Sequence, residues 1–177
     1  MAKTLSVGPF RVAGSFTHTN TTTLGATINY SDSVSWSGTL TDGSGASQAN
    51  KIYAELLTIN AAASNNLDLA GGVTDPFGTT FSFALLKLIY VELTTTTAAT
   101  SLQVGGHATL AVNTIFGSVT NHDTDQPCIK VRNGGVFFLG CTDATGYVVT
   151  ATTEDILLLK NLDGAAAATV KIVLVGA

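Results

Sequence analysis

Residues 121–125 carry the side chains best suited to metal binding. They read Asn-His-Asp-Thr-Asp, so that side-chain oxygens recur along a short polar segment. Oxygen ligands of this kind are those that a hard cation such as Ca²⁺ prefers. However, no glutamate follows at a spacing that would complete the site, and clusters of Asp, Asn and Thr are common in ordinary loops. We therefore expect a plain loop and assign no metal-ligand role to His122, Asp123, Thr124 or Asp125.

Cys128 and Cys141 flank the turn sequence Asn133-Gly134-Gly135. A two-residue turn at Gly134-Gly135 would place the two cysteines opposite each other in a hairpin, close enough for a disulfide. A turn at Asn133-Gly134 would instead misalign them by two residues. Because a reducing cytoplasm keeps thiols free by default, we expect free thiols and keep the disulfide as the alternative.

Other polar residues lack the spacing that zinc binding or catalysis requires. His18 and His107 each stand alone, whereas zinc needs several ligands at close spacing. Glu154 and Asp155 are adjacent, so in a strand they would point to opposite faces, which is poor geometry for acid–base chemistry. The sequence Gly43-Ser44-Gly45 is not a nucleophile elbow, and no nucleotide-binding motif is present. We expect no enzymatic activity, no catalytic residue and no cofactor.

The composition argues against nucleic acid and membranes as partners. Only 11% of the 177 residues are charged, against roughly 25% in an average soluble domain, and the net charge is −4. The eight Lys and Arg residues are scattered, so no basic patch is available to neutralise phosphates. The longest apolar run contains Lys87 and is shorter than the roughly 20 residues of a membrane span. Sparse charge is typical either of a surface covered by partners or of a neutral Thr-rich β surface, and the composition leaves both open.

Residues 67–93 organise the predicted fold. A turn at Asp75-Pro76-Phe77-Gly78 precedes a long run rich in Phe, Leu, Ile, Tyr and Val. Alternate positions of this run are apolar on both faces, which is typical of a central strand covered on both sides. A buried helix would show a similar run, but the β-forming residues favour a strand. The predicted core residues on this strand are Phe81, Phe83, Leu85, Ile89 and Val91.

Further short strands, separated by turns, follow the same logic. No segment has the pattern of a convincing amphipathic helix, so the chain is predicted to be all-β, an antiparallel, jelly-roll-like β-sandwich. We expect residues 61–66 to form a turn and residues 113–116 a loop or short edge strand. The predicted strands of the sandwich are residues 51–59, 101–104, 128–132, 136–139, 147–150, 156–160 and 170–175.

Residues 1–48 differ from the remainder in being rich in Ser, Thr and Gly. Their apolar residues alternate in short groups, which predicts short or edge strands joined by soft connections at residues 17–23 and 41–48. This region is either an extended N-terminal arm that reaches a neighbouring molecule or the first strands of the sandwich. We assign residues 1–48 to such an arm and residues 49–177 to the β-sandwich domain.

Several segments together resemble a family of tailed-bacteriophage virion proteins. The matching segments are TDGSGASQANKIYAE (41–55), LDLAGGVTDPFG (67–78), KVRNGGVFFLGCTDATGYVVT (130–150), EDILLLKN (154–161) and ATVKIVLVGA (168–177). The segments occur in the expected order, and the resemblance extends from Thr41 onward, over about three-quarters of the chain. The chain departs from the pattern at Asn133, where Pro is expected, and the first 40 residues match nothing in the family.

The resemblance implies a structural β protein of the virion without catalytic residues. We expect a capsid decoration, or cement, protein that bridges major capsid subunits on the head surface after synthesis in the cytoplasm of a bacterial host. The alternatives are a tail or fibre component that binds a host glycan or protein, and a Ca²⁺-dependent lectin-like domain. The expected partners are the major capsid protein and further copies of the chain, in a homo-oligomer with a trimer as the expected order.

Overall fold

The computed structural model describes residues 5–21, 27–75, 77–95, 100–117 and 127–177. The chain is all-β, as the sequence predicts, with one short helix, α1 (Asn113–Phe116). Residues 121–125, the segment whose side chains were weighed as metal ligands, lie outside the described residues. The strands are β1 (Val7–Thr21), β2 (Thr27–Leu40), β3 (Lys51–Ile59), β4 (Ser64–Asp68), β5 (Val73–Thr74), β6 (Thr80–Phe81), β7 (Leu85–Leu93), β8 (Ser101–Gly105), β9 (Cys128–Arg132), β10 (Val136–Gly140), β11 (Tyr147–Val148), β12 (Ile156–Asn161) and β13 (Ala168–Gly176).

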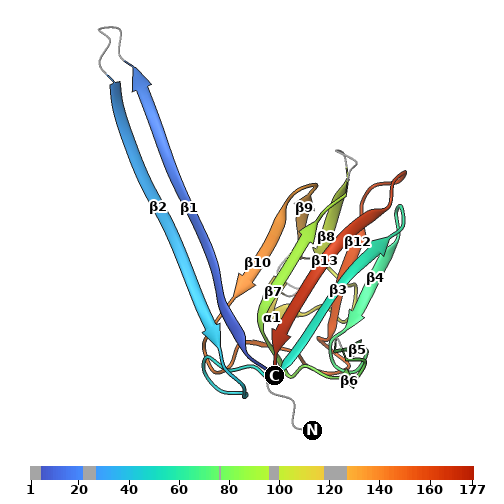
Figure 1. The fold of residues 1–177 in the computed structure, drawn as a ribbon. Coiled ribbons are helices and arrows are strands. Elements are labelled where there is room, and N and C mark those ends of the chain that lie inside the picture. Colours follow the sequence, from blue (N-terminus) through green and yellow to red (C-terminus); the bar gives the residue numbers. More distant parts are fainter. Residues whose placement is uncertain (1–4, 22–26, 76, 96–99, 118–126) are drawn as a thin grey trace.

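Two antiparallel sheets pack face to face and enclose the main core (Figure 1). One sheet has the order β10-β7-β13-β3, with β11 also paired to β7, and the other has the order β4-β12-β8-β9. Alternate residues of both sheets point inward and are fully buried, which confirms a β-sandwich-like architecture. The jelly-roll order of the strands stays a prediction. Inward residues at the centre include Ile89, Val91, Leu102, Val104, Leu157, Leu159, Ile172 and Leu174.

Strand β7 lies inside its sheet, as predicted; its inner face is fully buried and its outer face is partly covered. Ile89 and Val91 face the opposite sheet, while Leu88 and Tyr90 belong to a second apolar cluster on the outer side. A β-bulge at Lys87 changes the alternation. Leu86 and Leu88 of β7, which are two residues apart, pair with the adjacent residues Gly176 and Val175 of β13. Leu86 therefore points into the core, which the period-two pattern had placed on the other face.

The predicted core of this segment is correct at three of its five positions. Phe83, Ile89 and Val91 are buried, whereas Phe81 and Leu85 are only half-buried. Phe81 belongs to β6, which pairs with β5 around the predicted turn, so the apolar run is two strands and not one. Leu85 loses its inward position to Leu86 because of the bulge described above.

The predicted hairpin around Gly134-Gly135 does not form. Strand β9 pairs with β8 in one sheet and β10 pairs with β7 in the other, so the turn connects the two sheets. The backbone N–H of Gly134 donates to the carbonyl of Leu93, which fixes the turn to the end of β7. Cys128 begins β9 in one sheet and Cys141 directly follows β10 of the other, so the two are not cross-strand neighbours and no disulfide joins them.

Three local expectations were also wrong. Residues 61–66 were expected to form a turn, but residues 64–66 belong to strand β4, in which polar side chains precede the single buried residue Leu67 and hide the alternation. Residues 113–116 form helix α1 and not a loop or edge strand. The early strands are not short: β1 and β2 are 15 and 14 residues long and include residues 17–21, which were expected to be a connection.

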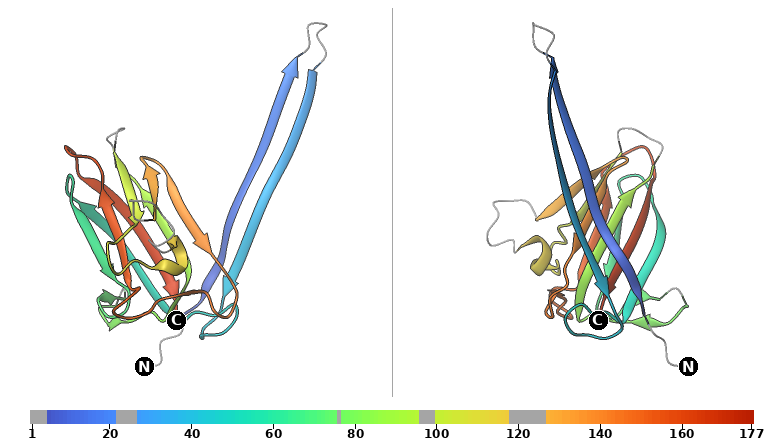
Figure 2. Two further views of the ribbon diagram at one scale, coloured as in Figure 1. Left: turned by 180° about the vertical axis from the view of Figure 1, so that it is seen from behind. Right: turned by 60° about the vertical axis from the view of Figure 1, so that its left-hand side comes forward.

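Strands β1 and β2 pair with each other alone and form a two-stranded hairpin that projects from the sandwich (Figure 2). Its base lies beside β10, and its far end reaches beyond the ends of the sandwich strands in every view. Within the described residues, no helix combines the length and the apolar character that a membrane crossing demands.

Candidate interaction surface

The β1–β2 hairpin has one apolar and one polar face. Residues directly opposite each other in an antiparallel pair point to the same side, and Val12 pairs with Trp36 while Gly14 pairs with Val34. The reverse face carries the pairs Arg11–Ser37, Ala13–Ser35, Ser15–Ser33 and Thr17–Ser31. We call the first face the apolar stripe; its large side chains are Phe10, Val12, Phe16, Tyr30, Val34 and Trp36.

Most of the apolar stripe is exposed. The exposed fractions are 58% for Phe16, 63% for Tyr30 and 56% for Val34. The 14 residues of β2 span roughly 45 Å, whereas the nine residues of β13 span about 30 Å. The sandwich of the same chain is therefore too short to cover the stripe. An isolated two-stranded hairpin is only marginally stable in water. A partner that covered the exposed part of the apolar stripe would therefore stabilise the hairpin.

Three aromatic rings attach the hairpin to the sandwich. Phe138 of β10 lies 6.2 Å from Phe10 and 5.9 Å from Trp36, and the latter two rings are 5.3 Å apart, between ring centroids. Two glycines make room for these rings. A Cβ on Gly38 would lie 2.6 Å from Phe10, and a Cβ on Gly140 would lie 2.8 Å from Trp36.

A β-bulge sets the direction in which the hairpin leaves the sandwich. Four residues of β1, Val7 to Phe10, oppose only three residues of β2, Gly38 to Leu40. The extra residue falls at Gly8-Pro9, where proline has no N–H that a ladder would need. The bulge puts both Val7 and Phe10 into the same apolar cluster, although their spacing would otherwise place them on opposite faces.

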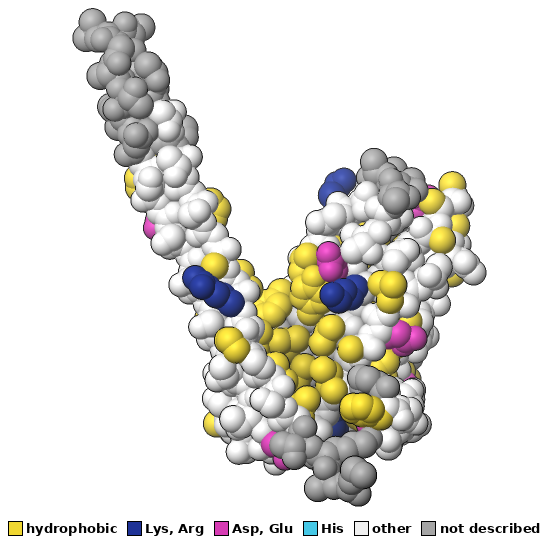
Figure 3. Space-filling model, in the orientation of Figure 1, with side chains coloured by type: hydrophobic (Ala, Val, Ile, Leu, Met, Phe, Trp, Pro, Cys, Tyr) yellow, Lys and Arg dark blue, Asp and Glu magenta, His cyan; other side chains and the backbone are white. Residues whose placement is uncertain are grey.

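The outer face of the sheet β10-β7-β13-β3 is also apolar. Leu56 and Val136 are 66% and 51% exposed, and Ile52, Tyr90 and Val173 are half-buried. We call these five residues the outer wall. Figure 3 shows hydrophobic side chains gathered in the angle between the hairpin and this sheet. We call that angle the apolar groove, with the apolar stripe and the outer wall as its two sides.

Few charged residues lie beside the outer wall, and the two on its central strands have opposite signs. Glu92 of β7 lies directly opposite Lys171 of β13 in the strand register. The hydroxyl of Tyr90 donates to Glu92 Oε2 at 2.6 Å. This hydrogen bond to the carboxylate raises the pKa of Tyr90, so the phenol stays neutral. The surface is therefore suited to apolar and neutral contacts.

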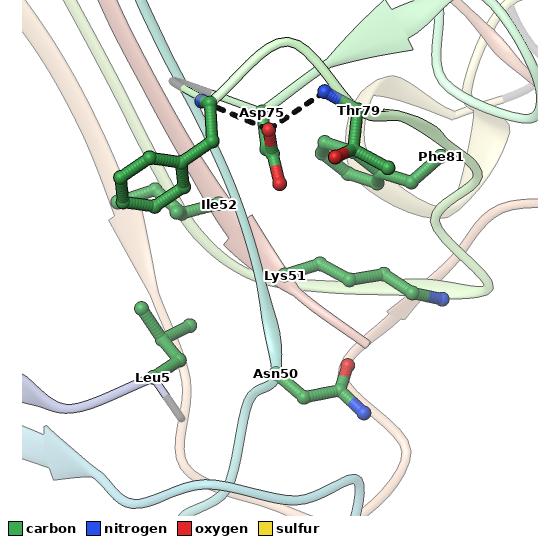
Figure 4. Close-up of a pocket in the computed structure, with 8 residues that line it drawn as sticks. Leu5, Asn50, Lys51, Ile52, Asp75, Thr79 and Phe81 are labelled. Atoms are coloured by element: carbon green, nitrogen blue, oxygen red, sulfur yellow. Dashed lines mark hydrogen bonds between the residues drawn. The ribbon is translucent and has the colours of Figure 1, made fainter. Parts of the chain in front are cut away.

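A small pocket continues the outer wall beyond Ile52 (Figure 4). Its volume is about 210 Å³, and Leu5, Ile52, Phe77 and Phe81 supply its apolar lining. The Asp75 carboxylate at its rim accepts hydrogen bonds from the backbone N–H groups of Phe77 and Thr79, both at 2.9 Å. Asp75 thus holds the turn between β5 and β6, and the pocket adds contact surface to the outer wall.

The polar residues singled out from the sequence hold local structure. His107 Nδ1 accepts a hydrogen bond from the backbone N–H of Leu110 at 3.0 Å. Glu154 accepts one from Asn113, and Asp155 accepts one from the N–H of Thr152. The side chain of His18 is outside the described part of the structure. Within that part, no three His, Cys, Asp or Glu side chains are placed to hold a metal ion.

The loop that contains Gly43-Ser44-Gly45 has a structural role of the same kind. The side-chain oxygen of Gln48 accepts a hydrogen bond from the N–H of Gly45 at 2.9 Å. A Cβ on Gly43 would lie 2.6 Å from that oxygen, so the glycine allows the loop to close on Gln48. The loop therefore folds around an amide side chain and follows the end of β2.

Comparison of the chain with models of known protein families, with curated proteins and with solved structures found no match. The resemblance to phage virion proteins therefore stays a prediction. The apolar stripe itself had a signal in the sequence, because apolar residues alternate with Ser, Thr and Gly around Phe10 and Trp36. The sequence did not predict that these two segments pair with each other along their whole length.

Proposed function

We propose that the chain is a structural protein of a tailed-phage virion, namely a capsid decoration protein that stabilises the head by bridging major capsid subunits. The observation that carries this proposal is the extended apolar surface of the stripe and the outer wall, which the chain leaves uncovered. Extended exposed apolar patches are typical of surfaces that bind other proteins.

The proposed mechanism is the burial of apolar area over many contacts. A decoration protein strengthens a shell because each copy contacts more than one neighbour, and every contact removes apolar surface from water. The projecting hairpin extends the reach of each copy by roughly 15 Å beyond its own sandwich strands. The low content of charged residues, 11%, is consistent with a surface that is largely covered in an assembly.

Copy number and location test this proposal directly. Virions of the phage that encodes the chain are separated into heads and tails, and the chain is quantified against the major capsid protein on a stained gel. We expect the chain on heads, at a copy number comparable to that of the capsid protein. A few copies confined to tails would contradict decoration and support a tail or fibre component, and absence from virions would overturn the proposal as a whole.

A second measurement tests the stabilising role. Heads made without the chain are heated beside complete heads, and the release of packaged DNA is followed with a DNA-binding dye. We expect release at a lower temperature without the chain, and recovery when purified chain is added back. Equal release temperatures would show that the chain does not cement the head.

A further inference from the structure

We propose that the apolar groove of one copy receives the hairpin of a second copy. The two sides of the groove are the apolar stripe of the hairpin and the outer wall of the sheet, and both are left open in a single chain. This proposal deepens the proposed function by naming one partner of the surface, but its test requires only the purified chain.

The shape of the groove favours a narrow β element as its occupant. Its sides are a two-stranded ribbon and a sheet face, and apolar β faces stack at a distance of about 10 Å with interlocking side chains. The chain itself provides such an element, because the distal hairpin is a free two-stranded ribbon with one apolar face. A hairpin placed on the outer wall of a second copy would cover both surfaces at once.

The area available is sufficient for a specific contact. The exposed parts of Phe16, Tyr30 and Trp36 alone amount to roughly 300 Å², since an aromatic side chain buries about 150–250 Å². With Val12, Val34 and the matching area of the outer wall, one hairpin–groove contact removes roughly 800 Å² from water. In a two-fold dimer the exchange is reciprocal, so one interface contains two such contacts and buries about 1,600 Å², the size of a standard interface; in a larger ring each interface contains one contact.

The charge distribution also favours a second copy over a charged partner. The charged groups of the outer wall side, Glu92 and Lys171, are opposite in sign and lie directly across from each other. Arg11 lies on the polar face of the hairpin, opposite the apolar stripe. The hairpin brings one carboxylate, Asp32, onto the apolar stripe, where it accepts a hydrogen bond from the Tyr30 hydroxyl, and the outer wall side offers Lys171 as its opposite charge.

The test begins with the mass of the full chain in solution. Sedimentation equilibrium from about 1 to 100 µM covers affinities of the strength expected for a contact of this size. We expect reversible association with a mass that is a whole multiple of the 18.1 kDa chain. The same multiple determines whether the ring is the predicted trimer. A chain that stays monomeric over this range would overturn the proposal.

Three matched variants locate the contact. Phe16→Ser with Val34→Ser changes the hairpin side, Leu56→Ser with Val136→Ser changes the outer wall, and Ser15→Ala with Ser33→Ala changes the polar face as the control. We expect the first two variants to associate at least about tenfold more weakly and the control to associate like the wild type. Circular dichroism and melting curves show that each variant is folded.

A mixing experiment distinguishes this contact from other modes of association. The hairpin variant retains an intact outer wall, and the wall variant retains an intact hairpin, so a mixture restores the contact between one intact hairpin and one intact outer wall. We expect the mixture to associate more tightly than either variant alone. Equal weakness of all three samples, or an equal effect of the control variant, would overturn the proposal.

The outcomes also separate this inference from the proposed function. A chain that associates as described but is absent from virions would refute the virion role and leave the hairpin–groove contact standing. A chain that is monomeric in solution but abundant on heads would refute the contact between copies and leave the decoration role standing. In that case the groove would bind another virion protein.

Discussion

The Lys87 side chain is fully buried at the bulge of β7, where its ammonium donates a hydrogen bond to the carbonyl oxygen of Asp143. A buried ammonium is tolerated only with such partners, because its transfer from water is costly. The neighbouring Cys141 shares this environment, and its N–H donates to the carbonyl of Lys87. Burial and the Asp143 carboxylate raise the pKa of the Cys141 thiol, and the Lys87 ammonium partly opposes them.

We predict that Cys141 reacts with iodoacetamide at a higher pH than an ordinary thiol. The thiolate is the reactive form, so a raised pKa moves the midpoint of the rate–pH profile above that of free cysteine. The profile is measured in a Cys128→Ser background, so that only one thiol reacts. Lys87→Met should raise the midpoint further and Asp143→Asn should lower it; shifts in the reverse directions would contradict this electrostatic account.

We predict that Phe83→Ala lowers the free energy of unfolding by roughly 3–5 kcal/mol. Phe83 is 2% exposed, and its ring packs edge-on against Phe81 with the ring centroids 4.9 Å apart. The matched control is Phe77→Ala, because Phe77 is 80% exposed, and this change should cost less than about 1 kcal/mol. Urea denaturation measures both values, and equal losses would show that Phe83 is not part of the core.

At the scale of the elements, the attachment of the hairpin depends on backbone geometry as much as on apolar contact. The bulge at Gly8-Pro9 turns β1 so that Phe10 faces the sandwich, and Gly38 and Gly140 leave space for the rings of Phe10 and Trp36. Larger residues at either glycine would separate the hairpin from β10. The direction of the projecting element is therefore set by a few residues at its base.

We predict that Gly140→Ala loosens this attachment. The added Cβ would lie 2.8 Å from the Trp36 ring, a contact that forces the ring to move and costs about 1–3 kcal/mol, as over-packing does. Trp36 is the single tryptophan of the chain, so its fluorescence reports the change as a shift to longer wavelength and stronger quenching by acrylamide. Gly164→Ala, whose Cβ would meet no atom within 4 Å, is the control and should leave the emission unchanged.

At the scale of the whole molecule, the hairpin and the sandwich differ in what stabilises them. The sandwich has a continuous core between its two sheets, whereas the distal hairpin is held by its own β1–β2 ladder. The sandwich is therefore expected to fold without the distal hairpin, and the hairpin to gain stability from a partner. The apolar stripe therefore lies on the part of the chain that depends least on the core of the sandwich.

We predict that replacing residues 14–34 with the turn sequence Asn-Gly leaves the melting temperature within about 3 °C of the wild type. The shortened hairpin keeps the Ala13–Ser35 and Val12–Trp36 pairs, together with the aromatic contacts at the base. Differential scanning calorimetry at a concentration below that of self-association measures the change. Loss of cooperative unfolding would show that the distal hairpin belongs to the folding unit of the sandwich.

The sequence alone determined the all-β class, the position of β7 and the buried state of Phe83, Ile89 and Val91. These features follow from local patterns, because a two-sided apolar run between turns has few other stable arrangements. The bulge at Lys87 could not be predicted from the sequence, because one extra residue in a strand does not change its composition noticeably. It alone moved Leu86 into the core in place of Leu85.

Only the tertiary structure decided which strands pair and where the apolar surface lies. The turn at Gly134-Gly135 has the sequence of a hairpin, yet β9 and β10 join different sheets, because pairing with β8 and β7 places Val131 of β9 and Phe137 and Leu139 of β10 against the core. Likewise, alternation around Phe10 and Trp36 predicts strands, but not that the two strands pair with each other. The long ladder between β1 and β2 turns two short patterns into one apolar stripe, since register is set by contacts between distant residues.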